Sequence, residues 1–193
     1  MKKVLLAAAL MISSVAAFAQ HAVGTVTIQP KVGMNVANFT DADNADPRIG
    51  LVAGAEFEYQ VSDIFSLSAG ALYSQQGCKG TEGGVTLTQK LDYINVPVMA
   101  NVYVAPGFAV KLGIQPGFKV NAEAEAKNGS NRIAAGNSSE FNSVDFSIPV
   151  GVSYEFSNVV LDARYNWGLT KNIKDFDNKN SVFQFTVGYK FAL

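Results

Sequence analysis

The sequence predicts an all-β fold, an eight-stranded antiparallel up-and-down transmembrane β-barrel, and three observations carry this prediction. Apolar and polar residues alternate with period two along most of the chain. Long and short connections alternate between these segments, and aromatic residues gather near the segment ends. Hydrophobic residues make up 48% of the chain and charged residues only 16%, yet no apolar run beyond residue 19 approaches the roughly 20 residues of a membrane-spanning helix. The apolar surface must therefore be spread over alternating strands.

The first residues have the three-part layout of a secretory signal peptide. Lys2 and Lys3 precede an apolar stretch, and the small residues Ala17 and Ala19 flank Phe18. We expect cleavage after Ala19, so that residues 1–19 are removed and residues 20–193 form the barrel domain. A retained membrane anchor is the alternative. Removing two lysines from 15 basic residues leaves 13 against 16 acidic ones, a balance that disfavours a nucleic-acid partner.

Eight segments carry the alternation, and each is long enough to cross a bilayer at a tilt. They cover residues 25–37, 48–59, 65–74, 91–104, 108–120, 144–156, 159–169 and 181–193. The apolar residues of each segment occupy alternate positions. These rows start at the first residue of the ranges 26–36, 49–59, 65–73, 94–102, 108–120, 144–156, 159–169 and 183–193. Small or polar residues occupy the opposite rows, as expected for strands with one face toward lipid and one toward a polar interior.

The connections indicate how such a barrel would sit in a membrane. Short turns are expected at 60–63, 105–107 and 157–158, and longer polar loops at 38–48, 76–90, 121–142 and 171–180. Outer-membrane barrels have short periplasmic turns, longer external loops and an even number of strands. With the amino terminus in the periplasm, all four long segments fall outside the cell.

Aromatic and charged residues follow the same geometry. Two aromatic girdles are predicted, one near the short turns (Phe57, Tyr59, Phe65, Phe108, Tyr154, Phe156, Tyr189, Phe191) and one toward the long loops (Tyr73, Phe118, Phe146, Tyr165, Trp167, Phe183). The polar rows carry five basic and five acidic residues: Lys31, Lys111, Lys119, Arg164, Lys190, Glu56, Glu58, Asp145, Glu155 and Asp162. Because isolated charges inside a narrow barrel would be costly, we expect these charges to pair in the lumen.

Four segments carry a family resemblance: AFAQ at the cleavage region, PKVGMNVANF at 30–39, LDYINVPVMANVYV at 91–104 and VGYKFAL at 187–193. They resemble the small outer-membrane β-barrel proteins of Bacteroidetes, often labelled PorT-like, and more broadly the barrels of the OmpX and OmpA transmembrane type. The resemblance implies an outer-membrane protein in contact with lipids and lipopolysaccharide, inserted by the barrel assembly machinery. That family usually ends in Phe, whereas in this chain Phe191 is followed by Ala192 and Leu193.

No residue is predicted to be catalytic or to bind a cofactor or metal. His21 is the only histidine and lies outside the first strand, which disfavours a Ser-His-Asp mechanism. Asp41, Asp43 and Asp46 suggest calcium binding, but the glycine and glutamate of an EF-hand loop are missing. A solvated loop is the expectation for this segment, and loose cation binding at the outer surface is the alternative.

Two further features have both a chemical and a structural interpretation. Glu56, Glu58, Asp162 and Arg164 could form a proton-handling or catalytic cluster, but charged residues that fill the lumen are expected instead. Cys78 is the only cysteine, which excludes an intrachain disulfide. An inert loop thiol is expected; a reactive, modified or intermolecularly paired thiol is the alternative.

The expected function is non-enzymatic: a structural or surface-interaction role, such as adhesion, host contact or envelope integrity, through the external loops. One alternative is a narrow barrel that transports or binds a small solute, and a third hypothesis is a lipid-modifying envelope enzyme. The main alternative fold is a soluble lipocalin-like barrel, with apolar rows inside and charged rows outside. The side of the wall on which Leu161, Ala163 and Tyr165 lie decides between the two folds.

Overall fold

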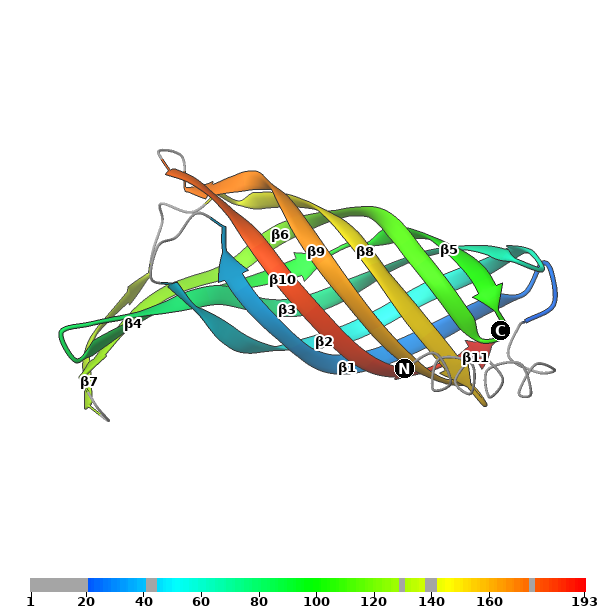
Figure 1. Ribbon diagram of the computed structural model, residues 1–193, viewed down its shortest axis with the longest axis horizontal. Helices are drawn as coiled ribbons and strands as arrows, with labels where there is room; N and C mark the ends of the chain where they lie inside the picture. Colours follow the sequence, from blue (N-terminus) through cyan, green and yellow to red (C-terminus); the bar gives the residue numbers. More distant parts are fainter. Residues whose placement is uncertain (1–20, 41–44, 129–130, 138–141, 174–175) are drawn as a thin grey trace, which may run out of the picture.

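The computed structural model describes residues 21–40, 45–128, 131–137, 142–173 and 176–193, which form a closed ring of eight antiparallel strands (Figure 1). The ring closes where β1 (Val26–Phe39) pairs with β10 (Phe176–Tyr189), with Met34 opposite Phe185. The predicted fold class is therefore confirmed. The predicted signal peptide, residues 1–19, lies outside the described residues.

Strands cross the barrel wall eight times, but one crossing is interrupted. The remaining bounds are β2 (Ala45–Ser62), β3 (Phe65–Glu82), β4 (Val85–Asn95), β5 (Val98–Ala105), β6 (Phe108–Asn128), β7 (Asn131–Asn137), β8 (Val144–Phe156), β9 (Val159–Ile173) and β11 (Phe191–Ala192). The strand predicted over 91–104 is split into β4 and β5, because Pro97 has no amide hydrogen for the ladder. Among the described residues, no helix is long and apolar enough to cross a membrane.

Tight turns join the strands at one end of the barrel, on the right in Figure 1, where the chain also ends. Two residues separate β2 from β3, β5 from β6, and β8 from β9. In the last turn both Ser157 (φ 48°) and Asn158 (φ 73°) have positive φ, which matches the turn to the twist of the flanking strands. Asn158 Nδ2 donates to the carbonyl of Lys190 at 3.1 Å, so this turn is tied to the C-terminal strand. We call this the short-turn end.

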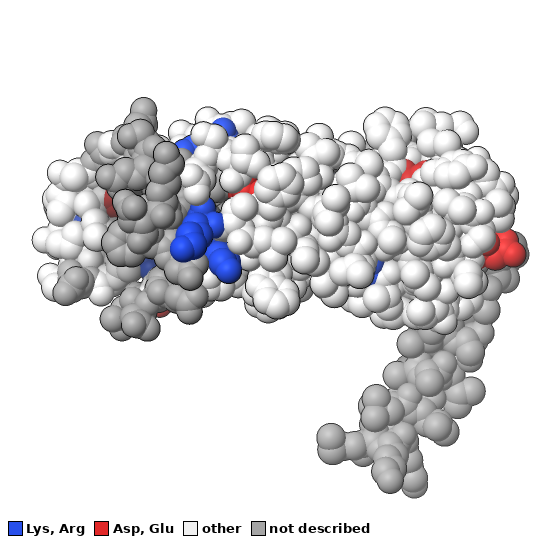
Figure 2. Space-filling view, turned by 90° about the horizontal axis from the view of Figure 1, so that it is seen from above, with Lys and Arg blue, Asp and Glu red and all other residues white. Residues whose placement is uncertain are grey.

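Apolar side chains face outward and polar side chains face the lumen. Leu161 is 58% exposed, whereas its neighbour Asp162 is 3% exposed and Arg164 is 2% exposed. The other wall strands alternate in the same way, with Phe185 and Val187 outside and Lys190 inside. On the face seen in Figure 2, few charged atoms reach the surface in the middle of the barrel. The soluble-barrel alternative required the reverse arrangement and is wrong.

The two aromatic girdles are present on the outer face. Phe57, Tyr59, Phe156, Tyr189 and Phe191 are exposed near the short-turn end, and Phe118, Phe146, Trp167 and Phe183 are exposed toward the other end. Such rings mark the two levels at which an apolar band meets the membrane interfaces. The apolar band is thus bounded on both sides.

The segments predicted as long loops are largely strand where they are described. β3 runs to Glu82, turns at Gly83 and Gly84, and returns as β4, so most of 76–90 is a hairpin. Within 121–142, β6 continues to Asn128 and β7 pairs back along it. The loops predicted at 38–48 and 171–180 are shortened in the same way by β2, β9 and β10. These extensions form because strands already paired in the wall continue their hydrogen bonding beyond it.

The exposed apolar belt predicts that a charge introduced on the outer wall destabilises the protein most where the wall meets hydrocarbon. Leu112→Arg, at a residue 55% exposed in the middle of the belt on β6, is expected to lower the free energy of unfolding by about 2–4 kcal/mol. Leu87→Arg is the matched control, because Leu87 is 57% exposed but lies on β4 beyond the belt. Urea unfolding in lipid vesicles measures both. Equal losses would show that the belt does not contact hydrocarbon.

Candidate functional site in the lumen and the projecting sheet

Five charged side chains from β1, β2, β6 and β9 meet inside the barrel, and we call them the central ion network. Lys31 Nζ lies 2.7 Å from Glu56 Oε2, and Arg164 Nη1 lies 3.0 Å from Glu56 Oε1. Asp162 accepts hydrogen bonds from Arg164 Nε at 2.7 Å and from Lys111 Nζ at 2.9 Å. All five residues are buried. The predicted pairing of lumen charges is confirmed for this set.

The central ion network spans the lumen. Arg164 on β9 bridges two carboxylates, Glu56 on β2 and Asp162 on its own strand. Lys31 pairs with both carboxylates, and Lys111 pairs with Asp162. Charge-assisted hydrogen bonds of this kind offset the large cost of removing each charge from water. The network therefore ties together strands that are not neighbours in the wall.

A second group of ionic contacts lies nearer the short-turn end. Lys190 Nζ is 2.8 Å from Glu155 Oε2 and 3.1 Å from Glu58 Oε2. Glu58 also accepts hydrogen bonds from Ser66 Oγ at 2.7 Å and from the hydroxyl of Tyr103. The cluster of Glu56, Glu58, Asp162 and Arg164 considered from the sequence is therefore divided. Glu58 belongs to this second group, and the other three belong to the central ion network. Tyr103 was not predicted from the sequence. It could have been, because it lies two residues after Asn101 and therefore on the same polar face of the strand.

Of the other sequence candidates that the structure describes, one contacts the second ionic group and one lies on the surface. His21 Nε2 is 3.3 Å from Glu155 Oε1, before the start of β1. Asp46 is exposed in β2, and Asp41 and Asp43 lie outside the described residues. No group of three or more His, Cys, Asp or Glu residues suited to a metal ion occurs in the part of the chain that the structure describes.

Neutral side chains line the lumen on the other side of the central ion network. Asn35 Nδ2 donates to Ser74 Oγ at 2.9 Å, and Gln115 Nε2 donates to Ser147 Oγ at 3.2 Å. Asn95, Asn166 and Gln184 are buried in the same part of the interior. This layer is polar but uncharged, which suits hydrogen bonding between strands.

Beyond the wall, β3, β4, β6 and β7 form a sheet that we call the projecting sheet, at the left of Figure 1. Glu125 on β6 pairs with Lys90 on β4, and Lys127 Nζ lies 3.2 Å from Glu125 Oε1. At the base of the sheet, Phe39, Cys78, Leu91 and Tyr93 form a buried apolar cluster, with Ala45 and Ala122 against it. The sheet is therefore anchored to the barrel by packing as well as by continuous strands.

Cys78 lies in β3 rather than in a loop, which corrects its predicted position. Its side chain is buried within the apolar cluster and the thiol is free. Burial raises the pKa of the Cys78 thiol to about 11. Because the thiolate is the reactive form, Cys78 is a weak nucleophile at neutral pH.

A closed barrel with an apolar belt, two aromatic girdles and a polar, ion-paired lumen defines the class of outer-membrane β-barrels. A family model described as "Outer membrane protein beta-barrel domain" matches residues 18–174. The chain belongs to this family, and it is an outer-membrane protein. No curated protein matches the sequence.

Solved structures share the fold at low sequence identity. Ail, the attachment invasion locus protein of Yersinia pestis, is 13% identical with a TM-score of 0.53, over 88% of this chain and 100% of that one. A structure of Ail with the heparin analogue sucrose octasulfate gives 12% identity and the same TM-score of 0.53, over 88% of this chain and 100% of that one. Neisserial surface protein A is 15% identical with a TM-score of 0.49, over 87% of this chain and 97% of that one. At these identities the likeness concerns the fold alone.

The charge balance of the central ion network predicts unequal effects of two substitutions. The network holds three cations and two anions. Asp162→Leu would leave three cations around Glu56, and it is expected to destabilise the protein by about 3–5 kcal/mol. Arg164→Leu would leave two lysines facing two carboxylates, so a smaller loss is expected. Unfolding in urea measures both variants; a greater loss for Arg164→Leu would contradict the assigned pairing.

Proposed function

We propose that the protein is a non-enzymatic surface-interaction protein, in which a sealed barrel anchors the projecting sheet on the outside of the cell. The projecting sheet carries this proposal. In the proposed orientation the amino terminus and the short turns are periplasmic, and the longer hairpins are extracellular. Short turns gathered at one end and the expected signal peptide over residues 1–19 support it.

The sealed lumen supports an anchoring role over solute transport. The central ion network crosses the interior between β2 and β9, and a second ionic group lies closer to the short-turn end. A solute would have to separate these buried pairs, each of which is costly to break. The same pairing supports a non-catalytic role for Glu56, Glu58, Asp162 and Arg164.

The edge of the projecting sheet supports binding of a partner. Among the described residues, β7 pairs with β6 only, so its other edge is available to an added strand. Ile133 on β7 is 57% exposed and would contact such a partner. An extended segment of an extracellular or host protein fits an edge of this kind.

The similarity to Ail agrees with this proposal but does not carry it. Ail is named an attachment invasion locus protein, and one of its structures holds a heparin analogue. We propose adhesion for this chain from its own sheet, with envelope integrity as the structural part of the role. Contact with lipopolysaccharide, insertion by the barrel assembly machinery and the PorT-like Bacteroidetes relationship belong to the same proposal.

The orientation is tested with a membrane-impermeant maleimide on intact cells. Thr81→Cys is exposed on the projecting sheet, and Asp63→Cys is exposed in a short turn. We expect rapid labelling of Thr81→Cys, and labelling of Asp63→Cys only after lysis. Native Cys78 contributes little background, because burial raises its pKa to about 11. Labelling of Asp63→Cys alone on intact cells would overturn the orientation.

The role is tested by shortening the projecting sheet. Replacing residues 79–88 and 122–141 with Asn-Gly turns keeps the wall strands, so the variant should remain folded and equally abundant in the outer membrane. Adhesion of cells to an epithelial layer is expected to fall at least tenfold relative to the unaltered protein. Asp63→Asn, in a short turn, is the control and should adhere normally. Unchanged adhesion of the shortened variant would contradict the proposed role.

A further inference from the structure

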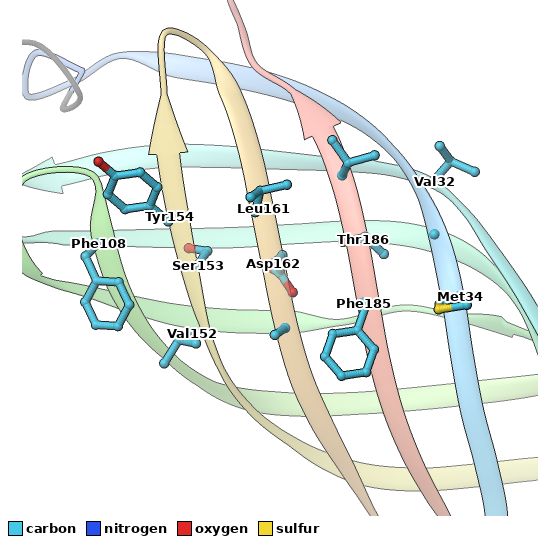
Figure 3. Close-up of a pocket in the computed structure, with 13 residues that line it drawn as sticks. Val32, Met34, Phe108, Val152, Ser153, Tyr154, Leu161, Asp162, Phe185 and Thr186 are labelled. Carbon is cyan, nitrogen blue, oxygen red and sulfur yellow. The ribbon is translucent and has the colours of Figure 1, made fainter. Parts of the chain in front are cut away.

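A hollow of about 680 Å³ lies on the outer wall of the barrel, within the apolar belt (Figure 3). It extends over β6, β8, β9, β10 and β1. Its lining includes the exposed side chains Met34, Leu161 and Phe185 and the half-buried rings of Phe108 and Tyr154. Ala163 lies among these larger side chains, and its small size leaves space between them.

The lining of this hollow selects for hydrocarbon. Ser153, Asp162 and Thr186 border it, but their side chains are buried toward the lumen and present no polar group to an occupant. The strands beneath it are also paired on both sides, so no free edge is available for an added strand. A headgroup or an extended peptide would leave its polar groups unpaired in this hollow. An alkyl chain has no polar groups, so it can occupy the hollow without this cost.

A second hollow of about 560 Å³ adjoins the first. The two share Val32 and Val187, which are directly opposite each other on β1 and β10. The second hollow is otherwise lined by Pro30, Ala53, Gly54, Val159, Gly188 and Tyr189, together with the backbone around Lys31. Two apolar hollows with a common ridge correspond to the two chains of one diacyl lipid.

The position of the hollows indicates which leaflet supplies this lipid. Phe108 begins β6 at a short turn, and Tyr154 lies two residues before β8 ends at another. Figure 3 shows the Tyr154 hydroxyl at the edge of the first hollow, where it can face the interfacial part of a lipid. In the proposed orientation this is the periplasmic half of the membrane, where phospholipid is found. We infer that the two hollows hold one glycerophospholipid as a resident ligand, an inference that depends on the proposed orientation.

Native mass spectrometry of the folded protein released from nanodiscs tests this inference. One nanodisc preparation contains dipalmitoyl phosphatidylethanolamine, and a parallel one also contains lipid A. The unaltered protein is expected to retain one phosphatidylethanolamine molecule. Ala163→Phe fills the first hollow and should reduce the retained fraction at least fivefold. Ala71→Phe is the matched control, because Ala71 faces outward on β3 outside both hollows and should keep the lipid.

Each other outcome contradicts the inference in a distinguishable way. Retention of no lipid, or equal retention by Ala163→Phe and Ala71→Phe, would show that the hollows are not a site. A mass of two protein chains without lipid would assign the hollows to a dimer contact. Retention of lipid A in place of phosphatidylethanolamine would contradict a glycerophospholipid ligand while leaving the hollows as an acyl-chain site; the maleimide labelling tests the orientation separately. If Ala163→Phe fails to fold, Val152→Trp blocks the same hollow from the neighbouring strand, since Val152 pairs with Ala163.

Discussion

The structure depends on one constraint: hydrocarbon outside the barrel accepts neither a charge nor an unpaired backbone amide. Ring closure between β1 and β10 satisfies the backbone, and strict alternation of side chains keeps charges in the lumen. The charges enclosed in this way must then find partners within a narrow space. The central ion network is the result, with Arg164 held between Glu56 and Asp162.

The same constraint separates the two parts of the molecule by role. Within the membrane the wall is closed and paired charges occupy its interior, an arrangement that suits the proposed anchoring role. Beyond the membrane the strands are free to leave the ring, and β3, β4, β6 and β7 continue as the projecting sheet. A rigid barrel thus holds an open-edged sheet at a distance from the lipid, which suits contact with another surface.

The sequence was sufficient for the features that depend on local pattern. Period two predicted which face of each strand meets lipid, as Leu161 and Asp162 show. The turns expected at 105–107 and 157–158 were located correctly, whereas the turn expected at 60–63 lies at 63–64 because β2 continues to Ser62. The β3–β4 hairpin of the projecting sheet was missed because residues 76–90 have the composition of a loop, while their pairing depends on strands already aligned by the barrel. The partners of each lumen charge could not be predicted either. Glu56 and Arg164 are 108 residues apart, and only the stagger of the closed ring brings them together.

Spin labelling along β9 tests most directly whether apolar side chains face lipid and polar side chains face the lumen. Nitroxides placed one at a time at residues 159–169 in lipid vesicles report whether each site is reached by lipid-soluble oxygen. We expect high oxygen accessibility at 161, 163 and 165, and low accessibility at 162, 164 and 166, with period two throughout. High accessibility at the even positions, or no periodicity, would contradict a barrel wall with its apolar face toward lipid.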